Sequence, residues 1–351
     1  MGIFTALLIL SFLIFFHELG HFTAARFFGV RVDVFSIGFG KKVFSKQVGE
    51  TEWRFSMIPL GGYVKMKGQD DTDPTFVSYD EDSYNIKKPW QRIIILLAGP
   101  FANFLLAFLI YLSVSFMGVP KLLATVGDIN QTQPAYLAGM RVGDTITQIN
   151  QTSVIYWEDL GKTINQSANQ LQITVLRDNN YIDLTITPTL QKVKNRFNEV
   201  IERKLIGIQP DINATKNISY GLTEGLDYAY MQTKNASLLI VKGLQQLLSG
   251  LVPMEQLGGV VSIVDVTAKA SSVGVMALLF FTALISVNLG VLNLLPIPAL
   301  DGGHIVFNIY EMITKRKPNE EIMYRLTLIG WSILLTMMLI GLYNDINRLI
   351  G

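Results

Sequence analysis

The sequence predicts a membrane α-helical protein with four transmembrane helices, a membrane-associated β element and an inserted extracytoplasmic α+β domain. Half of the 351 residues are hydrophobic and only 16% are charged, whereas about a quarter of the residues in a soluble domain are charged. The apolar residues gather in uncharged runs near the length of about twenty residues that crosses a bilayer as a helix. Between two of these runs, short stretches of alternating polarity indicate half-buried strands.

Four uncharged runs are the candidate spans. They cover Met1–Phe16, with the helix continuing to Ala25, then Ile93–Pro120, Ser271–Leu300 and Leu326–Asn344. The first run could also be a signal peptide, but it lacks a basic leading region and a small-residue cleavage site. We therefore expect a retained helix.

The third run is too long and too broken for one straight helix. Asn293, Pro296 and Pro298 interrupt it, and proline inside a helix removes a donor and clashes with the preceding turn. We expect a helix to about Leu292, an unwound stretch, and a short helix from about Asp301. Because unwound backbone at membrane depth is tolerated only in protein or beside a wet cavity, this stretch marks a candidate site.

Basic residues predict the orientation, because positively charged short loops stay in the cytoplasm. Both termini and the region 121–270 should therefore lie outside the cytoplasm. The basic residues of the two loops assigned to the cytoplasm are Arg26, Arg31, Lys41, Lys42, Lys46, Arg54, Lys65, Lys67, Lys87, Lys88, Arg92, Lys315, Arg316, Lys317 and Arg325.

The outer region reads as a small α+β domain. Strands are expected at 123–129, 144–149, 171–176 and 181–187, and helices at 135–139 and 157–165. Two segments resemble the core of a circularly permuted bacterial PDZ domain: Pro134-Ala-Tyr-Leu-Ala-Gly139 and Arg141 to Asn150. This resemblance implies a groove in which an extended chain can add as a strand. Leu238–Val252 is expected to be an amphipathic helix lying at the membrane interface.

Charge and composition narrow the function. A net charge of +1 leaves no basic field for nucleic acid, so we expect no nucleic-acid partner. The chain has no cysteine, so any metal must be held by His, Asp or Glu.

The strongest motif is His17-Glu-Leu-Gly-His21 on the first span, in which Glu18 follows the first histidine. Histidines at i and i+4 share a helix face and can bind one zinc ion, with the glutamate as general base. The alternative is a pair of helix histidines beside a solvated glutamate. That reading is poor in lipid, where an unpaired carboxylate is costly.

A catalytic zinc needs a third protein ligand, and Asp301 is the candidate. The first and third spans run in the same direction, so His17, His21 and Asp301 lie at similar depth. Alternatively, Asp301 only caps the following helix. Glu255 and Asp265 are weaker rivals, because they lie on the other side of the membrane.

The motifs HELGH and NLLPIPALDGG, with the PDZ-like insert between spans two and three, resemble those of the site-2 protease family of intramembrane zinc metalloproteases. Within that family the chain resembles the bacterial RseP-type proteins. The resemblance implies a Zn²⁺ cofactor held by His17, His21 and Asp301, and Glu18 as catalytic base. It implies regulated intramembrane proteolysis of single-span membrane proteins, anti-sigma factors or remnant signal peptides, in the bacterial inner membrane near its cytoplasmic side.

The same resemblance suggests substrate-binding residues. Asn288 and Asn293 match positions that contact substrate near the scissile bond. The stretch Arg54–Lys67, which holds Gly61, Gly62 and Tyr63, resembles the family's membrane-associated β element and could pair with an extended substrate; alternatively it is a solvated hairpin. His304 is expected near the site without binding the metal directly.

The predicted domains, in order, are the first span with its motif, the loop with the β element, the second span, the PDZ domain, a connector with amphipathic helices, the broken third span, a short helix and loop, and the fourth span. Their ranges are 1–25, 26–92, 93–120, 121–190, 191–270, 271–302, 303–325 and 326–345. RseP-type proteins often carry two PDZ domains, whereas this chain has room for one.

Two other functions stay open. The first is a proteolytically inactive membrane scaffold that binds partners through the PDZ groove, although such a descendant would be expected to lose part of the motif. The second is a proton-coupled transporter using Glu18 and Asp301, although the inverted repeats typical of transporters are not found. The sequence does not predict the oligomeric state.

Overall fold

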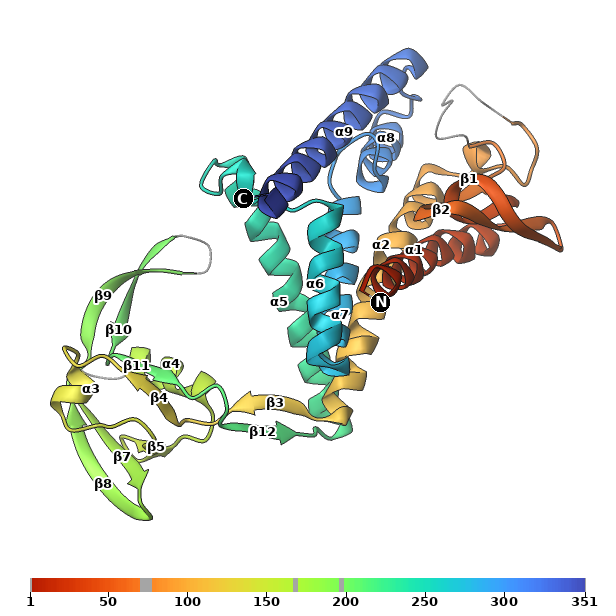
Figure 1. The fold of residues 1–351 in the computed structure, drawn as a ribbon. Coiled ribbons are helices and arrows are strands. Elements are labelled where there is room, and N and C mark those ends of the chain that lie inside the picture. Colours follow the sequence, from red (N-terminus) through yellow and green to blue (C-terminus); the bar gives the residue numbers. More distant parts are fainter. Residues whose placement is uncertain (1, 70–77, 167–169, 196–198, 351) are drawn as a thin grey trace. The chain divides into compact units, whose positions relative to one another are not determined.

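The computed structural model describes residues 2–69, 78–166, 170–195 and 199–350 (Figure 1). Four of its helices are long and apolar enough to cross a membrane: α1 (Gly2–Phe27), α2 (Pro89–Met117), α7 (Val275–Asn293) and α9 (Glu320–Ile350). They coincide with the four predicted runs, so the prediction of a membrane protein with four apolar helices is confirmed.

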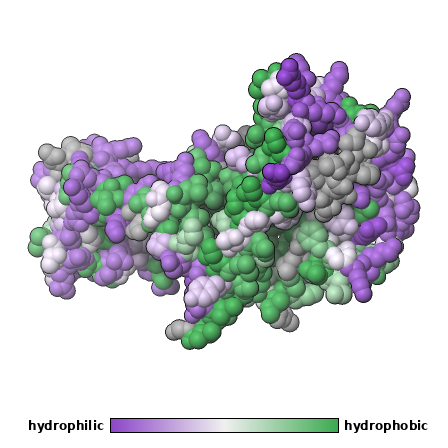
Figure 2. Space-filling model, turned by 90° about the horizontal axis from the view of Figure 1, so that it is seen from above, coloured by the Kyte–Doolittle hydropathy of each residue, from purple (hydrophilic) through white to green (hydrophobic). Residues whose placement is uncertain are grey.

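The chain divides into two compact units, each described by itself. We call Met1–Ser113 together with Leu226–Gly351 the helical unit, and Val114–Gly225 the inserted unit. Hydrophobic residues gather over the surface of the helical unit, whereas hydrophilic residues predominate on the inserted unit (Figure 2). An apolar exterior suits helices that face hydrocarbon rather than water.

The third apolar run is broken as predicted, with one further break. α6 (Val260–Val273) ends at Gly274, whose φ of +135° favours glycine, and α7 follows directly. α7 ends at Asn293, residues 294–300 are not helical, and α8 (Asp301–Thr314) begins at the predicted aspartate. The two prolines in the gap have no amide hydrogen for a helix.

The β element consists of β1 (Val32–Val48) and β2 (Thr51–Met66). Each residue of 34–37 has a Cα partner on both sides, one in 52–55 and one in 62–65. The segment 62–66 therefore forms one edge of this small sheet. Phe35 stacks on Trp53 with ring centroids 4.4 Å apart, and both rings contact Phe22 of α1.

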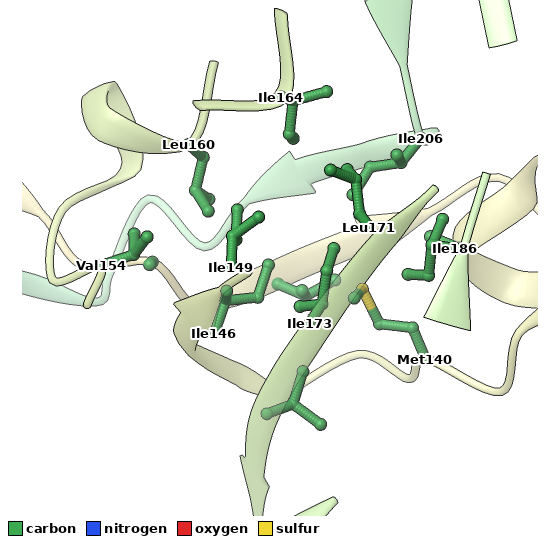
Figure 3. Close-up of a cluster of buried hydrophobic side chains, with 14 residues drawn as sticks. Met140, Ile146, Ile149, Val154, Leu160, Ile164, Leu171, Ile173, Ile186 and Ile206 are labelled. Carbon is green, nitrogen blue, oxygen red and sulfur yellow. The ribbon is translucent and has the colours of Figure 1, made fainter. Parts of the chain in front are cut away.

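The inserted unit is built around a conventional apolar core. Buried side chains from β5, β7 and α4 converge in it, among them Ile146, Ile173 and Leu160 (Figure 3). The elements are β3 (Val119–Leu122), β4 (Val126–Ile129), α3 (Pro134–Leu137), β5 (Thr145–Ile149), β6 (Thr152–Ser153), α4 (Trp157–Gln166), β7 (Leu171–Arg177), β8 (Asn180–Ile186), β9 (Thr189–Lys194), β10 (Val200–Leu205), β11 (Ile208–Pro210) and β12 (Thr215–Ile218).

The expectation of a connector directly after residue 190 is wrong in its first part. β9 pairs with β10, β11 pairs with β4, and β12 pairs with β3. Ile206 is buried in the core of the inserted unit. β9 and β10 are neighbours in the chain, whereas the partners of β11 and β12 lie more than 70 residues earlier. Strand formation depends on such pairing as well as on the local pattern.

The helix expected at the membrane interface also differs. α5 (Leu222–Leu248) begins 16 residues before the predicted Leu238. Its Ala229 and Ala236 are buried in a cluster with Ala107 of α2 and Ala283 of α7. Small residues allow helices to approach closely in a membrane, and this packing replaces the isolated position at the interface. Two short 3₁₀ helices, Tyr84–Ile86 and Met254–Gln256, complete the described elements.

Candidate metal centre

Two histidines and one aspartate meet inside the helical unit. The Nε2 atoms of His17 and His21 lie 3.2 Å apart, and they lie 3.3 and 3.4 Å from Oδ2 of Asp301. The spacing of four residues places both imidazoles on one face of α1, and the break after α7 brings the first residue of α8 to them. These are the three residues that the sequence predicts as metal ligands.

The three atoms fit a zinc ion. Ligand atoms about 2.0 to 2.1 Å from a tetrahedral zinc are about 3.3 Å apart, which matches the observed separations of 3.2, 3.3 and 3.4 Å. Among the described residues, Oδ2 of Asp301 is buried and has no hydrogen-bond partner. Two imidazoles and one carboxylate are also a donor set that leaves a fourth position open in catalytic zinc sites.

Residues of helix α2 contact both imidazole rings at Nδ1, the ring nitrogen that does not face Asp301. Nδ1 of His21 lies 2.8 Å from the carbonyl oxygen of Ile95, and Nδ1 of His17 lies 3.1 Å from the side-chain amide of Asn103. A side chain at Gly99 would collide with the His21 ring. The close approach of α1 and α2 therefore requires glycine at this position.

The start of α8 is fixed by the unwound stretch before it. Gly302 and Gly303 are buried, and a side chain on either would collide with backbone atoms of residues 294–298. Farther along α8, Glu311 forms an ion pair with Arg92 of α2 at 2.7 Å, with both side chains largely buried. The same helix that orients the histidines is thus tied to the helix that carries Asp301.

A cavity of about 930 Å³ contains the three residues and Glu18. Gly61, Gly62 and Tyr63 of β2 also line it, as predicted from the β element. Its other lining residues include Asn103, Asn293, His304, Thr327 and Trp331. The last two come from α9, which the sequence analysis did not connect with the site.

The two predicted asparagines of α7 differ in position. Asn293 lines the cavity, with its side-chain amide 3.4 Å from Nε2 of His17. Asn288 is half-buried and is not among the residues that line the cavity. His304 lines the cavity but does not belong to the group of three.

The β element lies directly against the segment of α1 that carries His17 and Glu18. A Cβ atom on Gly62 would come within 2.8 Å of Ile14 and 3.2 Å of Cγ of Glu18. On the same sheet, Arg54 donates to Glu52 at 2.5 Å and to the Tyr63 hydroxyl at 3.4 Å. The Arg54 guanidinium lowers the pKa of Glu52 to about 2, so this ion pair is charged at neutral pH.

Comparison with known proteins places the whole chain in one group. The model of peptidase family M50 matches residues 5–337. A protein of Campylobacter jejuni subsp. jejuni named "Putative zinc metalloprotease" is 45% identical, with 98% of this chain and 93% of that protein covered. A Helicobacter pylori protein of the same name is 39% identical, with 98% and 99% covered. The "Regulator of sigma-W protease RasP" of Bacillus subtilis is 28% identical, with 98% and 97% covered.

Proposed function

Because the chain belongs to peptidase family M50 and is a zinc metalloprotease of the site-2 type, we propose that His17, His21 and Asp301 hold its zinc and that Glu18 is the general base for cleavage of a peptide bond within the membrane. The convergence of the two Nε2 atoms on Oδ2 of Asp301 carries this proposal.

The chemistry divides between the ion and the chain. Zinc, when bound, supplies the Lewis acidity that activates water and polarises a carbonyl group. Glu18 accepts a proton from the attacking water while the oxygen of that water bonds to the carbonyl carbon. It passes that proton to the leaving amine when the carbon–nitrogen bond breaks. Asn293, whose amide lies beside His17, is suited to donate to the oxyanion.

The substrate has to be extended where it is cut. A transmembrane helix keeps its carbonyl groups in its own hydrogen bonds, so a single-span substrate must unwind locally. The segment from Gly61 to Tyr63 lines the cavity at a sheet edge, where an extended chain can add as a further strand. We propose single-span membrane proteins as substrates, either anti-sigma-factor-like proteins or remnant signal peptides, and the name of the Bacillus subtilis relative supports a regulatory role.

For the arrangement in the inner membrane of a bacterium, we propose that both termini and the inserted unit lie outside the cytoplasm, with the active site near the cytoplasmic side. The basic residues between α1 and α2 support this orientation. The chain has no cysteine, so single substitutions Lys88→Cys and Lys162→Cys give labelling sites without background. An impermeant thiol reagent added to intact spheroplasts should label the second and spare the first. The opposite pattern would reverse the topology.

The inserted unit is proposed to be a PDZ-type domain. The order β4, α3, β5, α4 supports this assignment, with one of the two resembling motifs on α3 and the other spanning β5. Such a domain above a membrane site can exclude substrates with bulky outer portions. Cleavage of one membrane segment carrying a short or a large folded outer portion tests this role, and equal rates would contradict it.

The function itself is tested by the variant Glu18→Gln in detergent, with a model single-span substrate and with bound zinc measured in both proteins. We expect cleavage to fall by roughly 10²- to 10⁴-fold, the usual contribution of a general base, while zinc stays bound. Equal cleavage, or no zinc in either protein, would overturn the proposal and favour the inactive scaffold.

A further inference from the structure

We propose that Asn103 is a positioning residue that prepares His17 for zinc by accepting the Nδ1 hydrogen of its ring on the side-chain oxygen. This inference rests on the proposed function, because it takes Nε2 of His17 as a zinc ligand. Asn103 is fully buried in α2 and its side chain lies 3.1 Å from Nδ1 of His17.

The argument begins with the tautomer of the ring. A neutral imidazole carries one hydrogen, and the nitrogen without it binds the metal. Nε2 of His17 points to His21 and Asp301, so the hydrogen has to be on Nδ1. A buried Nδ1 hydrogen needs an acceptor, and a ligand histidine usually donates this hydrogen to an oxygen.

Asn103 offers that acceptor. The structure places the amide nitrogen, Nδ2, 3.1 Å from Nδ1. In that orientation the ring would accept a hydrogen bond at Nδ1 and would carry its own hydrogen on Nε2, where zinc could not bind. Turning the amide by half a turn exchanges its nitrogen and oxygen without moving another group. The oxygen of this amide is buried and has no hydrogen-bond partner among the described residues. The turned amide gives it one, the Nδ1 hydrogen of His17.

The position of Asn103 is well fixed for such a role. Its backbone carbonyl accepts a hydrogen bond of 2.8 Å from the hydroxyl of Ser286, a fully buried residue of α7. The turn of α2 that carries Asn103 is thereby held against a second spanning helix. A rigidly held partner fixes the direction of the ring as well as its tautomer.

The two ligand histidines differ in the group that accepts the hydrogen bond from their Nδ1 atoms. His21 donates to the backbone carbonyl of Ile95 at 2.8 Å, which no substitution of a side chain removes. His17 depends on a side chain, so its support can be changed. The backbone carbonyl of Gly99 also lies near the His17 ring, and it is the rival acceptor that an experiment must separate from Asn103.

Two nearly isosteric variants separate the roles. Asn103→Asp keeps an oxygen toward the ring, whereas Asn103→Leu keeps only the volume. Each is made in the full-length protein carrying Glu18→Gln, so that zinc affinity is measured by competition with a chromogenic chelator and does not depend on activity. Asn344→Leu serves as the matched control, because Asn344 is a buried asparagine that bonds to the carbonyls of Met254 and Leu257 and does not line the cavity.

We expect Asn103→Leu to weaken zinc binding by roughly 10- to 100-fold, the usual effect of losing such a partner. Asn103→Asp should bind zinc at least as tightly as the parent, and Asn344→Leu should leave the affinity unchanged. Parent affinity in Asn103→Leu would overturn the proposal and assign the role to Gly99. Equal weakening in both Asn103 variants would also overturn it, because the acceptor oxygen would then be irrelevant.

Folding and the premise are tested separately. If Asn103→Leu does not give a monodisperse protein, Asn103→Ala and Asn103→Ser take its place, since neither keeps an oxygen within reach of the ring. Their weakening relative to Asn103→Asp carries the same meaning. If the parent protein binds no zinc, the proposed function fails, and this result differs from every outcome that concerns Asn103 alone.

Discussion

The helical unit and the inserted unit both bury apolar side chains, but they differ in what they expose and in which polar side chains they bury. In the inserted unit, isoleucine, leucine and valine fill the centre and hydrophilic residues predominate on the surface (Figures 2 and 3). In the helical unit, large apolar side chains are exposed along α1 and α9, whereas His21, Asn103, Ser286 and Asn308 are buried. Hydrocarbon around a helix removes the penalty for apolar exposure and raises the penalty for polar exposure. Among the buried polar residues of the helical unit, His21 and Asn103 belong to the candidate metal centre, whereas Asn344 and Asp345 hold α9 to neighbouring segments.

The buried carboxylates sharpen this comparison. Asp301 meets two histidines, whereas Asp144 of the inserted unit accepts two hydrogen bonds of 2.7 Å from Arg177. Asp345 of α9 accepts hydrogen bonds from the backbone at the start of α6. Asp144 and Asp345 are buried and Asp301 is partly buried, but of the three only Asp301 has a buried oxygen without a hydrogen-bond donor.

The largest effect is expected for Asp301→Ala. Removing one of three ligands should abolish stoichiometric zinc binding, and cleavage should fall by more than the roughly 10²- to 10⁴-fold expected for loss of the general base. Bound zinc per protein is measured after dialysis, with Asp345→Ala as the control. Asp345→Ala should keep its zinc and lower thermal stability. Retention of zinc in Asp301→Ala would remove Asp301 from the ligand set.

The next effect concerns the β element. Gly62→Ala places a methyl group within 2.8 Å of Ile14 and 2.9 Å of the Ser36 carbonyl oxygen, so the strand edge must move away from Glu18. A misplacement near 1 Å can reduce a rate by about 10²-fold, and we expect a loss of about 10- to 100-fold in kcat/KM with zinc retained. Gly243→Ala on α5 is the control, since it has open space. Equal rates in both variants would separate the β element from catalysis.

The apolar core of the inserted unit should affect stability without affecting the metal. Ile173→Ala removes a fully buried side chain and should lower the free energy of unfolding by about 2 to 5 kcal/mol. Hydrogen exchange of the β5, β7 and β8 amides in the full-length protein measures this free energy of unfolding. The zinc content of the same protein is measured in parallel. Ile155→Ala, at a side chain that is 54% exposed, should change little. Loss of zinc in Ile173→Ala would show that the two units are coupled.

The smallest effects compare two ion pairs of the inserted unit. Asp144→Asn weakens charge-assisted hydrogen bonds at a side chain that is 1% exposed, and should cost about 1.5 to 3 kcal/mol. Lys121→Ala breaks an exposed pair with Glu158, and should cost less than about 1 kcal/mol. Hydrogen exchange of the β7 amides at increasing denaturant concentration measures the free energy of unfolding of both variants. A larger loss for Lys121→Ala would contradict the ranking by burial.

Much of the local structure followed from the sequence. The four spans, the break before Asp301 and the strands β4, β5, β7 and β8 were predicted, because hydrophobic length, proline and alternation act within a few neighbouring residues. The motif of His17 and His21 is local for the same reason. The assignment of Asp301 needed one nonlocal argument, the common direction of two spans, and the structure brings these three residues together.

The remaining features depend on contacts between distant segments, so only the tertiary structure decided them. β11 and β12 form strands because β4 and β3, far earlier in the chain, supply their partners. α5 packs on α2 and α7 through alanines that no periodic pattern distinguishes. Packing also decides which residues line the cavity: Trp331 of α9 does, and Asn288 of α7 does not. The position of Asn103 beside Nδ1 of His17 follows from the close approach of α1 and α2. The sequence by itself determined which side chains can do chemistry, and tertiary packing decided which of them meet.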